Sequence, residues 1–234
     1  MATNSIKENL VGWRASLMPS IPLSGLISRD PVTYKWKSPF RCWLLREATF
    51  WRVTDLLSQS LALHEQGHGL GARILLRSSF ETLATLIYLN LLIREVVSGQ
   101  LNFHLFGRKT ETLLFGSRDQ STKHKSLNII PVLGKCNKRY PGLLSIYESL
   151  SESAHPNYEG MLAGYSAVDR KEFETRFLNR WMDTYGASHT SAMELCMRTY
   201  HYEYDNVWVG LIEELEIWVN ENNNELEVTR LTES

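Results

Sequence analysis

The chain has 234 residues, of which 43% are hydrophobic and 22% charged, and its formal net charge at pH 7 is −1. A chain of this length can bury a sizeable core, and its near-zero charge excludes a global attraction to nucleic acid or membranes, so any basic site has to be local. Cys42, Cys136 and Cys196 are far apart and form no C-x-x-C pair. This argues against a disulfide framework or a thiolate zinc site and favours a reducing compartment.

The N-terminal segment lacks the apolar core of a secretion signal, so we expect a cytoplasmic location. Residues 74–93 are apolar and long enough to span a bilayer, but they include Arg77 and Glu81. Each charge at the centre of a membrane helix costs about 2.5–3.5 kcal/mol. We therefore expect a buried helix and no membrane partner.

The first third of the chain predicts two long helices. Residues 1–38 are expected to form an N-terminal helix and a loop arm, because their second half is rich in proline and turn-forming residues. Apolar residues then recur at helical spacing from 39 to 63. The glycines at 67, 69 and 71 interrupt this pattern before a very apolar helix at about 72–97.

The remaining pattern is also helical, and alternating strand patterns are almost absent. The expected elements are a weak amphipathic helix at 101–115, a polar loop at 116–126, two short helices at 127–140 and 142–154, a turn-rich connector at 155–166, helices at 169–183 and 188–220, and a frayed tail at 223–234. The fold class predicted is all-α, a multi-helix bundle of about six to eight helices whose domain covers residues 39–222.

The string "HEQGHGLGARI" contains the H-E-x-x-H pattern of zinc peptidases at His64, Glu65 and His68. On a helix this spacing places both imidazoles on one face, with the glutamate positioned to activate a zinc-bound water. Ile74 occupies the position of the third ligand in one large group of these enzymes. The glycines also fall where the histidines would need a rigid helix.

Two interpretations of the string stay open. His68 can open the next helix, where a polar side chain bonds free backbone N–H groups, and this is the interpretation that we favour, with no metal bound. A zinc-dependent hydrolase would need a distant third ligand, such as Glu81 or His104.

Four polar residues are spaced by four along the apolar helix at 72–97, namely Arg73, Arg77, Glu81 and Thr85. They line one edge of a helix whose other positions are apolar and therefore buried. Buried charges must be paired or hydrogen-bonded. The stripe predicts either a structural Arg77–Glu81 ion pair or a polar pocket in the bundle core.

A second informative string, "YESLSESAHPNYEG", places His155 at a predicted helix end. A histidine in such a junction can titrate near neutral pH or act as a base. Asn157 and Tyr158 follow it and could fix the tautomer of its imidazole through hydrogen bonds. The alternative is that His155 caps the helix C-terminus and interacts with the helix dipole.

Together with "GARILLRSSFETLATLIYL", this string resembles a group of bacterial all-α proteins distantly allied to the HEPN superfamily (higher eukaryote and prokaryote nucleotide-binding). The likeness covers roughly residues 40–220, and these two strings carry it. HEPN proteins are helical bundles, often dimers, and many are metal-independent RNases of toxin–antitoxin, abortive-infection and CRISPR defence systems. Their R-x(4–6)-H motif supplies a histidine that deprotonates the attacking 2′-hydroxyl and an arginine that stabilises charge on the phosphate.

The chain departs from that motif, because no arginine precedes His155 at the required spacing. Arg118 and His124 do have an R-x(5)-H spacing, but they fall in a predicted polar loop. The resemblance therefore implies the fold more strongly than it implies nuclease chemistry.

The resemblance implies a cytoplasmic homodimer of a defence or toxin-type system which, as an enzyme, would cleave RNA without a metal or other cofactor. The residues expected to converge in the bundle core are His155, Arg77 and Glu81 as catalytic groups, and Asn157, Tyr158 and Arg73 as binding groups. The alternative is a non-catalytic helical module that binds a nucleotide, or a partner protein of the same operon, through the same pocket.

Overall fold

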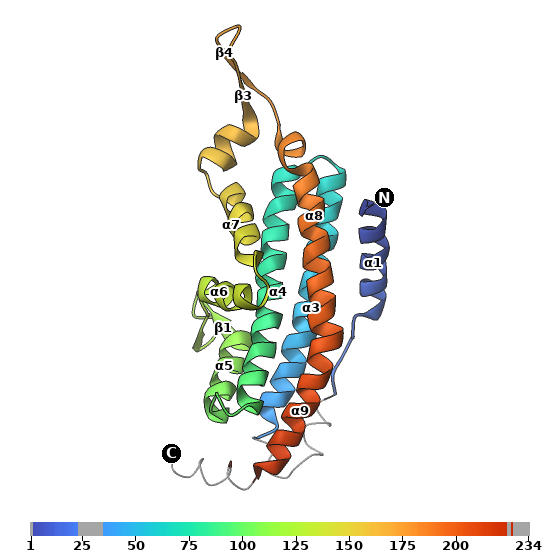
Figure 1. The fold of residues 1–234 in the computed structure, drawn as a ribbon, viewed down its shortest axis with the longest axis vertical. Helices are drawn as coiled ribbons and strands as arrows, with labels where there is room; N and C mark the ends of the chain where they lie inside the picture. Colours follow the sequence, from blue (N-terminus) through green and yellow to red (C-terminus); the bar gives the residue numbers. More distant parts are fainter. Residues whose placement is uncertain (1, 23–34, 224–225, 227–234) are drawn as a thin grey trace. The chain divides into compact units, whose positions relative to one another are not determined.

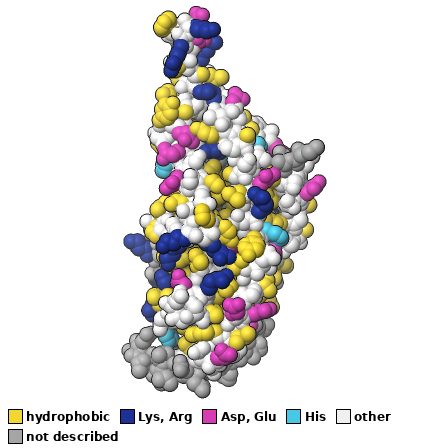
Figure 2. Space-filling model, viewed as in Figure 1, with side chains coloured by type: hydrophobic (Ala, Val, Ile, Leu, Met, Phe, Trp, Pro, Cys, Tyr) yellow, Lys and Arg dark blue, Asp and Glu magenta, His cyan; other side chains and the backbone are white. Residues whose placement is uncertain are grey.

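The computed structural model describes residues 2–22, 35–223 and 226. These residues form eight α-helices, two π-helical turns and two small two-stranded sheets, which confirms the all-α fold class (Figure 1). Residues 23–34 of the predicted arm and most of the predicted tail lie outside the described residues. On the face seen in Figure 2, basic and acidic side chains both occur, as expected for a chain of near-zero net charge.

The chain divides into two compact units, each assembled from three stretches of sequence. Unit 1 contains residues 1–17, 50–84 and 130–199, and unit 2 contains residues 18–49, 85–129 and 200–234. Three of the five divisions fall inside the helices α3 (Lys37–Glu65), α4 (Gly69–Val97) and α8 (Trp181–His201), and the other two follow residues 17 and 129. The predicted domain limits at residues 39 and 222 stay a prediction.

Unit 1 holds the parts of α3 and α4 that flank their junction. Its other elements are α1 (Ala2–Ser16), α6 (Ile129–Arg139), α7 (Leu143–Ala154), the π-helix η1 (Tyr158–Ala163), β3 (Ser166–Asp169), β4 (Glu174–Phe177) and nearly all of α8. Its core includes Leu76 and Phe80 of α4, both 0% exposed, and Trp181 of α8, 1% exposed. The predicted burial of the apolar helix is thus confirmed here.

Unit 2 holds the remaining part of α4, with Leu86 and Ile87 fully buried. Its other elements are α5 (Phe103–Phe115), β1 (Gly116–Ser117), β2 (His124–Lys125), the π-helix η2 (Tyr202–Val207) and α9 (Trp208–Glu221). α5 begins after Asn102, whose side chain accepts hydrogen bonds from two backbone N–H groups of the first turn.

The junction of α3 and α4 is built by the glycines that the sequence places there. α3 ends at Glu65, and the backbone N–H groups of Gly67 and His68 donate to the carbonyls of His64 (3.0 Å) and Leu63 (2.8 Å). This is a Schellman end, and its left-handed position is Gly67, with φ +79°. The predicted interruption is confirmed, and α4 starts at Gly69, three residues earlier than predicted.

The predicted helix at 169–183 is wrong over most of its length. β3 and β4 form an antiparallel hairpin there, with Ser166 opposite Phe177 and Asp169 opposite Glu174. Its turn is stabilised by the Asp169 carboxylate, which accepts the N–H groups of Lys171 (3.0 Å) and Glu172 (3.2 Å). Such a side-chain turn competes with a helix start, because the carboxylate satisfies backbone N–H groups in a non-helical conformation.

No helix among the described residues combines the length and the apolar character needed to cross a membrane. The apolar stretch at 74–93 lies within α4, where most of its side chains are buried.

Candidate functional site: a pocket beside Arg73

The polar stripe of α4 contacts α7. Arg73 donates from Nε to Ser153 Oγ (2.7 Å) and from Nη2 to the carbonyl of Ser149 (3.1 Å). One turn further on, Arg77 donates from Nε to Ser151 Oγ (2.8 Å). The two strings that carry the family resemblance therefore lie against each other, through arginines on α4 and serines on α7.

Arg77 and Glu81 form the ion pair that the stripe predicted. Arg77 Nη2 lies 3.1 Å from Glu81 Oε1, and each side chain is 27% exposed. The hydroxyl of Tyr147 donates to Glu81 Oε1 (2.9 Å), and burial together with this bond raises the pKa of Tyr147. The expectation of a fully buried pair is wrong, because this edge of α4 is partly open to solvent.

Arg73 is the stripe residue held in the core, with its side chain 3% exposed. Burial lowers the pKa of its guanidinium, and the Glu159 carboxylate, 3.7 Å from Nη2, opposes that shift. The guanidinium also stacks over the ring of Tyr185, 4.2 Å from its centroid. Within the described part of the chain, Nη1 of Arg73 makes no hydrogen bond, so one fork of the group is left for a ligand.

A pocket of about 600 Å³ opens at Arg73 between α7 and α8. It is lined by Arg73, Ser145, Ile146, Ser149, Leu150, Ser188, Ser191, Ala192, Leu195 and Arg198. Two serines separated by three or four positions face it from each of α7 and α8, and the apolar lining residues Ile146, Leu150, Ala192 and Leu195 lie beside them. The volume lies in the range of small-ligand sites.

The charged side chains that line this pocket are both basic. Two arginines line it, and none of its lining residues is acidic. Arg198 is exposed and forms no ion pair within the part of the chain that the structure describes. Arg73 keeps Glu159 as an ion-pair partner outside the lining, at 3.7 Å. Because guanidinium groups and hydroxyls are donors that suit oxyanions, the lining favours an anionic group that can compete with this carboxylate.

His155 does not lie where it was expected. It is the residue at the C-terminal end of α7, where its N–H donates to the carbonyl of Glu152 (3.4 Å), and its side chain is exposed. It does not line the pocket and has no contact with Arg77 or Glu81 among the described interactions. The helix-end alternative gives its position correctly.

The two neighbours of His155 serve the backbone or face solvent. Asn157 Oδ1 accepts the N–H of Gly160 (3.0 Å) and so caps the π-helix η1. Tyr158 is 75% exposed. Neither side chain is in contact with the imidazole of His155 among the hydrogen bonds and ring contacts described, so the expected fixing of a tautomer is not seen.

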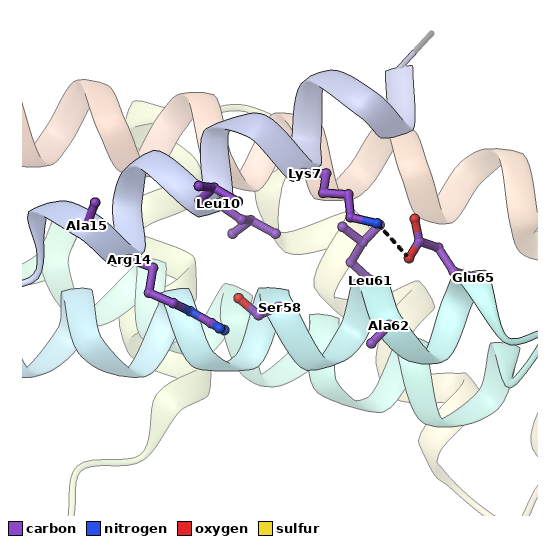
Figure 3. Close-up of a pocket in the computed structure, with 9 residues that line it drawn as sticks. Lys7, Leu10, Arg14, Ala15, Ser58, Leu61, Ala62 and Glu65 are labelled. Carbon is purple, nitrogen blue, oxygen red and sulfur yellow. Dashed lines mark ion pairs between the residues drawn. The ribbon is translucent and has the colours of Figure 1, made fainter.

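The H-E-x-x-H string does not form a zinc-site geometry. The Schellman end after Glu65 separates the two histidines, and His68 lies exposed in the junction, where its carbonyl accepts the first helical N–H of α4 from Ala72 (3.0 Å). Glu65 instead pairs with Lys7 of α1 (3.7 Å), at the edge of a second pocket of about 560 Å³ between α1 and α3 (Figure 3). Among the described residues, no group of three or more potential ligands could hold a metal ion.

His64 has a different partner that sequence spacing could not indicate. Its ring stacks on His189 of α8, with centroids 4.9 Å apart, and Ser60 Oγ lies 3.2 Å from His189 Nε2. Burial lowers the pKa of His189 to about 3, with contributions from His64 and Arg73. Burial also lowers the pKa of His64, and among the described residues the Nδ1 atoms of both histidines have no hydrogen-bond partner. A proton added to either ring would be buried without a partner, which favours the neutral form of the pair.

A separate cluster of polar side chains lies in the core of unit 2. Arg46 pairs with Glu47 and stacks on Tyr204 (3.4 Å), whose hydroxyl donates to Glu47 (2.9 Å). Nearby, the fully buried Glu203 accepts from Asn90 (2.7 Å). These contacts pair the charged groups with one another in the core, which fits a structural role, and only Arg46 Nε and Asn90 Oδ1 of this cluster are buried without a hydrogen-bond partner among the described residues.

Comparison of the chain with protein-family models, curated proteins and solved structures gives no match. No family is therefore assigned to the chain.

Sequence reasoning singled out Arg73 but missed the rest of the pocket. Ser188, Ser191 and Arg198 share one face of α8 at spacings of three and seven, and Ser145 and Ser149 share one face of α7. These periodic serines were a readable signal on predicted helices. What the sequence could not indicate is that the two faces meet at Arg73, because that depends on how the helices pack.

Proposed function

We propose that this chain binds a phosphate-bearing ligand, of the nucleotide or RNA class, in the pocket beside Arg73. The observation that carries the proposal is the lining itself, which combines two arginines and four serines with no carboxylate. Phosphate oxygens are acceptors only, and guanidinium groups bind them bidentately. This is the nucleotide-binding alternative rather than the catalytic one.

Each part of the pocket has a defined task in this proposal. Arg73 is oriented by Ser153 and Ser149, so its remaining N–H groups are held in place before the ligand arrives. Arg198 is exposed and adds a second positive charge at the rim. Leu150 and Leu195 supply an apolar surface suited to a base or sugar.

The experiment is a binding titration with ATP, AMP, inorganic phosphate and a short single-stranded RNA, measured by calorimetry. We expect Arg198→Ser to weaken binding of the preferred ligand about tenfold, or about 1.4 kcal/mol, and to fold normally because the residue is exposed. Glu159→Gln should strengthen binding, because Glu159 is the carboxylate that competes for Arg73. Failure of all four ligands to bind would contradict the proposal.

The matched control is Arg77→Gln. Arg77 belongs to the same stripe of α4 but does not line the pocket. Replacing Arg77 should leave the ligand affinity within about twofold of wild type, a smaller change than the loss of a charged hydrogen bond to the ligand would cause. Equal losses in the Arg77 and Arg198 variants would indicate a non-specific charge effect instead of a site.

RNA cleavage in a defence or toxin-type system, which the HEPN resemblance implies, stays a prediction, as do the homodimer and the cytoplasmic location. Its test is incubation of RNA with the purified protein in EDTA, comparing wild type with His155→Ala and Arg73→Lys. Metal-independent cleavage lost in the His155 variant would restore the catalytic assignment. Ligand binding without cleavage would support the binding module.

A further inference from the structure

The pocket of about 560 Å³ between α1 and α3 is a groove that follows both helices within unit 1 (Figure 3). Its lining residues recur at helical spacing, so one stripe of α1 faces one stripe of α3. They are Lys7, Leu10, Val11, Arg14 and Ala15 on α1, and Ser58, Leu61, Ala62 and Glu65 on α3. This α1–α3 groove shares no lining residue with the pocket beside Arg73.

The floor of the α1–α3 groove is apolar. Leu10 and Leu61 are 5% and 6% exposed, and the small side chains of Ala62 and Ser58 leave space beside them. The Ser58 hydroxyl donates to the carbonyl of Thr54 within its own helix (2.7 Å), so its proton is not offered to a ligand. An apolar molecular surface laid on this floor would be removed from water, which favours binding.

The charged side chains of the groove lie at its two ends. Figure 3 shows Lys7 paired with Glu65 at one end, where their charged atoms are 3.7 Å apart, and Arg14 near Ser58 at the other end. Arg14 is exposed and forms no ion pair or hydrogen bond within the described part of the chain. Because Glu65 balances Lys7, the lining keeps one uncompensated positive charge, on Arg14. A guanidinium group binds a carboxylate bidentately.

The spacing of these ends sets the size of a matching ligand. Lys7 and Arg14 are two helical turns apart, or about 10 Å along the axis of α1. A molecule with one anionic head at Arg14 and an unbranched apolar tail of about this length would cover the apolar floor between them. A nucleotide fits this groove poorly, because its several charges and polar sugar would face Leu10 and Leu61.

We propose that the α1–α3 groove binds an amphipathic monoanion, a carboxylate with an unbranched apolar tail. The head pairs with Arg14, and the tail lies on Leu10 and Leu61. This site is independent of the proposed phosphate site, since the two are lined by different residues.

Calorimetric titrations with hexanoate, octanoate and decanoate, each kept monomeric, test the proposal. We expect the affinity to rise about twofold to fourfold for each added methylene, the upper value being that of a fully buried group. Decyltrimethylammonium has a tail of the same length as decanoate and the opposite charge, and it should bind at least about tenfold more weakly. Equal binding of these two ions, or no binding of decanoate up to about 1 mM, would overturn the proposal.

Two variants separate the roles of the head and the tail. Arg14→Gln should weaken decanoate binding about tenfold and leave the binding of uncharged decanol unchanged. Ala62→Leu fills the groove and should weaken both ligands. Arg14 and Ala62 are exposed, so both variants should keep the wild-type thermal melt. The matched control is Arg170→Gln, which removes an exposed arginine that lines neither pocket. Equal losses in the Arg14 and Arg170 variants, or full binding in the Ala62 variant, would contradict the assignment.

Two further outcomes would place the anion elsewhere. Loss of decanoate binding in Arg198→Ser but not in Arg14→Gln would move it to the pocket beside Arg73 and overturn the proposal. Co-sedimentation of the protein with phosphatidylglycerol vesicles, lost in Arg14→Gln, would overturn it in favour of a membrane surface. Decanoate binding that Arg198→Ser leaves intact supports the proposal even where no phosphate-bearing ligand binds.

Discussion

Arg77 and Glu81 lie one turn apart on α4, and their partial exposure, 27% for each side chain, sets the size of their contribution to stability. Exposed ion pairs contribute about 0.2–1 kcal/mol, and a hydrogen bond such as that from Tyr147 contributes about 1 kcal/mol. We therefore expect Glu81→Ala to lower the free energy of unfolding by about 1–2 kcal/mol in urea melts. The double variant Arg77→Met with Glu81→Leu should cost less, because it leaves no unpaired charge. A loss above about 3 kcal/mol in the single variant would indicate a fully desolvated pair.

His189 makes the stability of the fold pH-dependent. Its pKa is about 3 in the folded chain against 6.5 for an ordinary histidine, so between these values the unfolded chain binds the extra proton. Stability is therefore complete above pH 6.5 and falls as the pH decreases towards 3, by at most about 1.4 kcal/mol per pH unit from this group. Urea melts between pH 7 and 4 should show a smaller slope in His189→Gln than in wild type.

The control for this pH dependence is His155→Gln, which removes an exposed histidine at the end of α7. Its melts should keep the wild-type slope. An unchanged slope in the His189 variant would show that carboxylates alone produce the acid sensitivity.

At the scale of elements, we expect Gly→Ala substitutions at two positions to change the stability of the fold in opposite directions. A Cβ on Gly164 would lie 2.5 Å from ring atoms of Trp181, which is buried, whereas a Cβ on Gly210 in α9 would meet no atom of the described residues within 4 Å. Gly164→Ala should therefore destabilise unit 1 by about 1–3 kcal/mol, the range for overpacking. Gly210→Ala should be neutral or stabilise by up to about 1 kcal/mol, because alanine favours helix. Thermal melts of the two variants decide the point.

The helices could be predicted because their apolar residues recur at helical spacing over many residues and because glycine or proline lies near their boundaries. Gly67 is an example, since a turn with positive φ was readable from the run of glycines. The β3–β4 hairpin could not be predicted in this way. Its four-residue strands are too short for a clear period, and the side-chain turn at Asp169 gives no signal that differs from a helix cap.

The candidate site was predicted only in part for a related reason. A charged residue in an otherwise apolar helix stands out in the sequence, and for this reason Arg73 and the Arg77–Glu81 pair could be predicted as polar groups of the site. Arg198 sits on an ordinary polar helix face, and only packing brings that face to Arg73. His155 was misplaced because a residue at a helix end can point inward or outward with the same local sequence.

At the scale of the whole molecule, the reactivity of the three cysteine thiols can show when each of the two units opens. Cys42 lies in unit 2 and Cys136 and Cys196 lie in unit 1, all fully buried, and burial raises the pKa of the Cys42 and Cys196 thiols. A thiol reagent should therefore react with none of them in the native protein and with all three in denaturant.

The rates of that reaction measure cooperativity. Because α3, α4 and α8 each contribute residues to both units, we expect one cooperative opening and equal labelling rates at Cys42 and Cys196 in sub-denaturing urea. Mass spectrometry of labelled peptides gives the two rates. Faster labelling of either site would show that its unit opens by itself.

The assembly of each unit from three distant stretches also constrains how the chain is made. Unit 1 lacks its third stretch until residue 199 has been synthesised, while α4, whose mean character is the most apolar among the early helices, is complete at Val97. At ribosomal speeds of about 5–20 residues per second, that helix waits roughly 5–20 seconds for its last neighbours. During this interval the apolar face of α4 is not yet covered by α8 and can associate with other chains. Fragments that stop before α8 should therefore aggregate and appear in the insoluble fraction of an expressing cell.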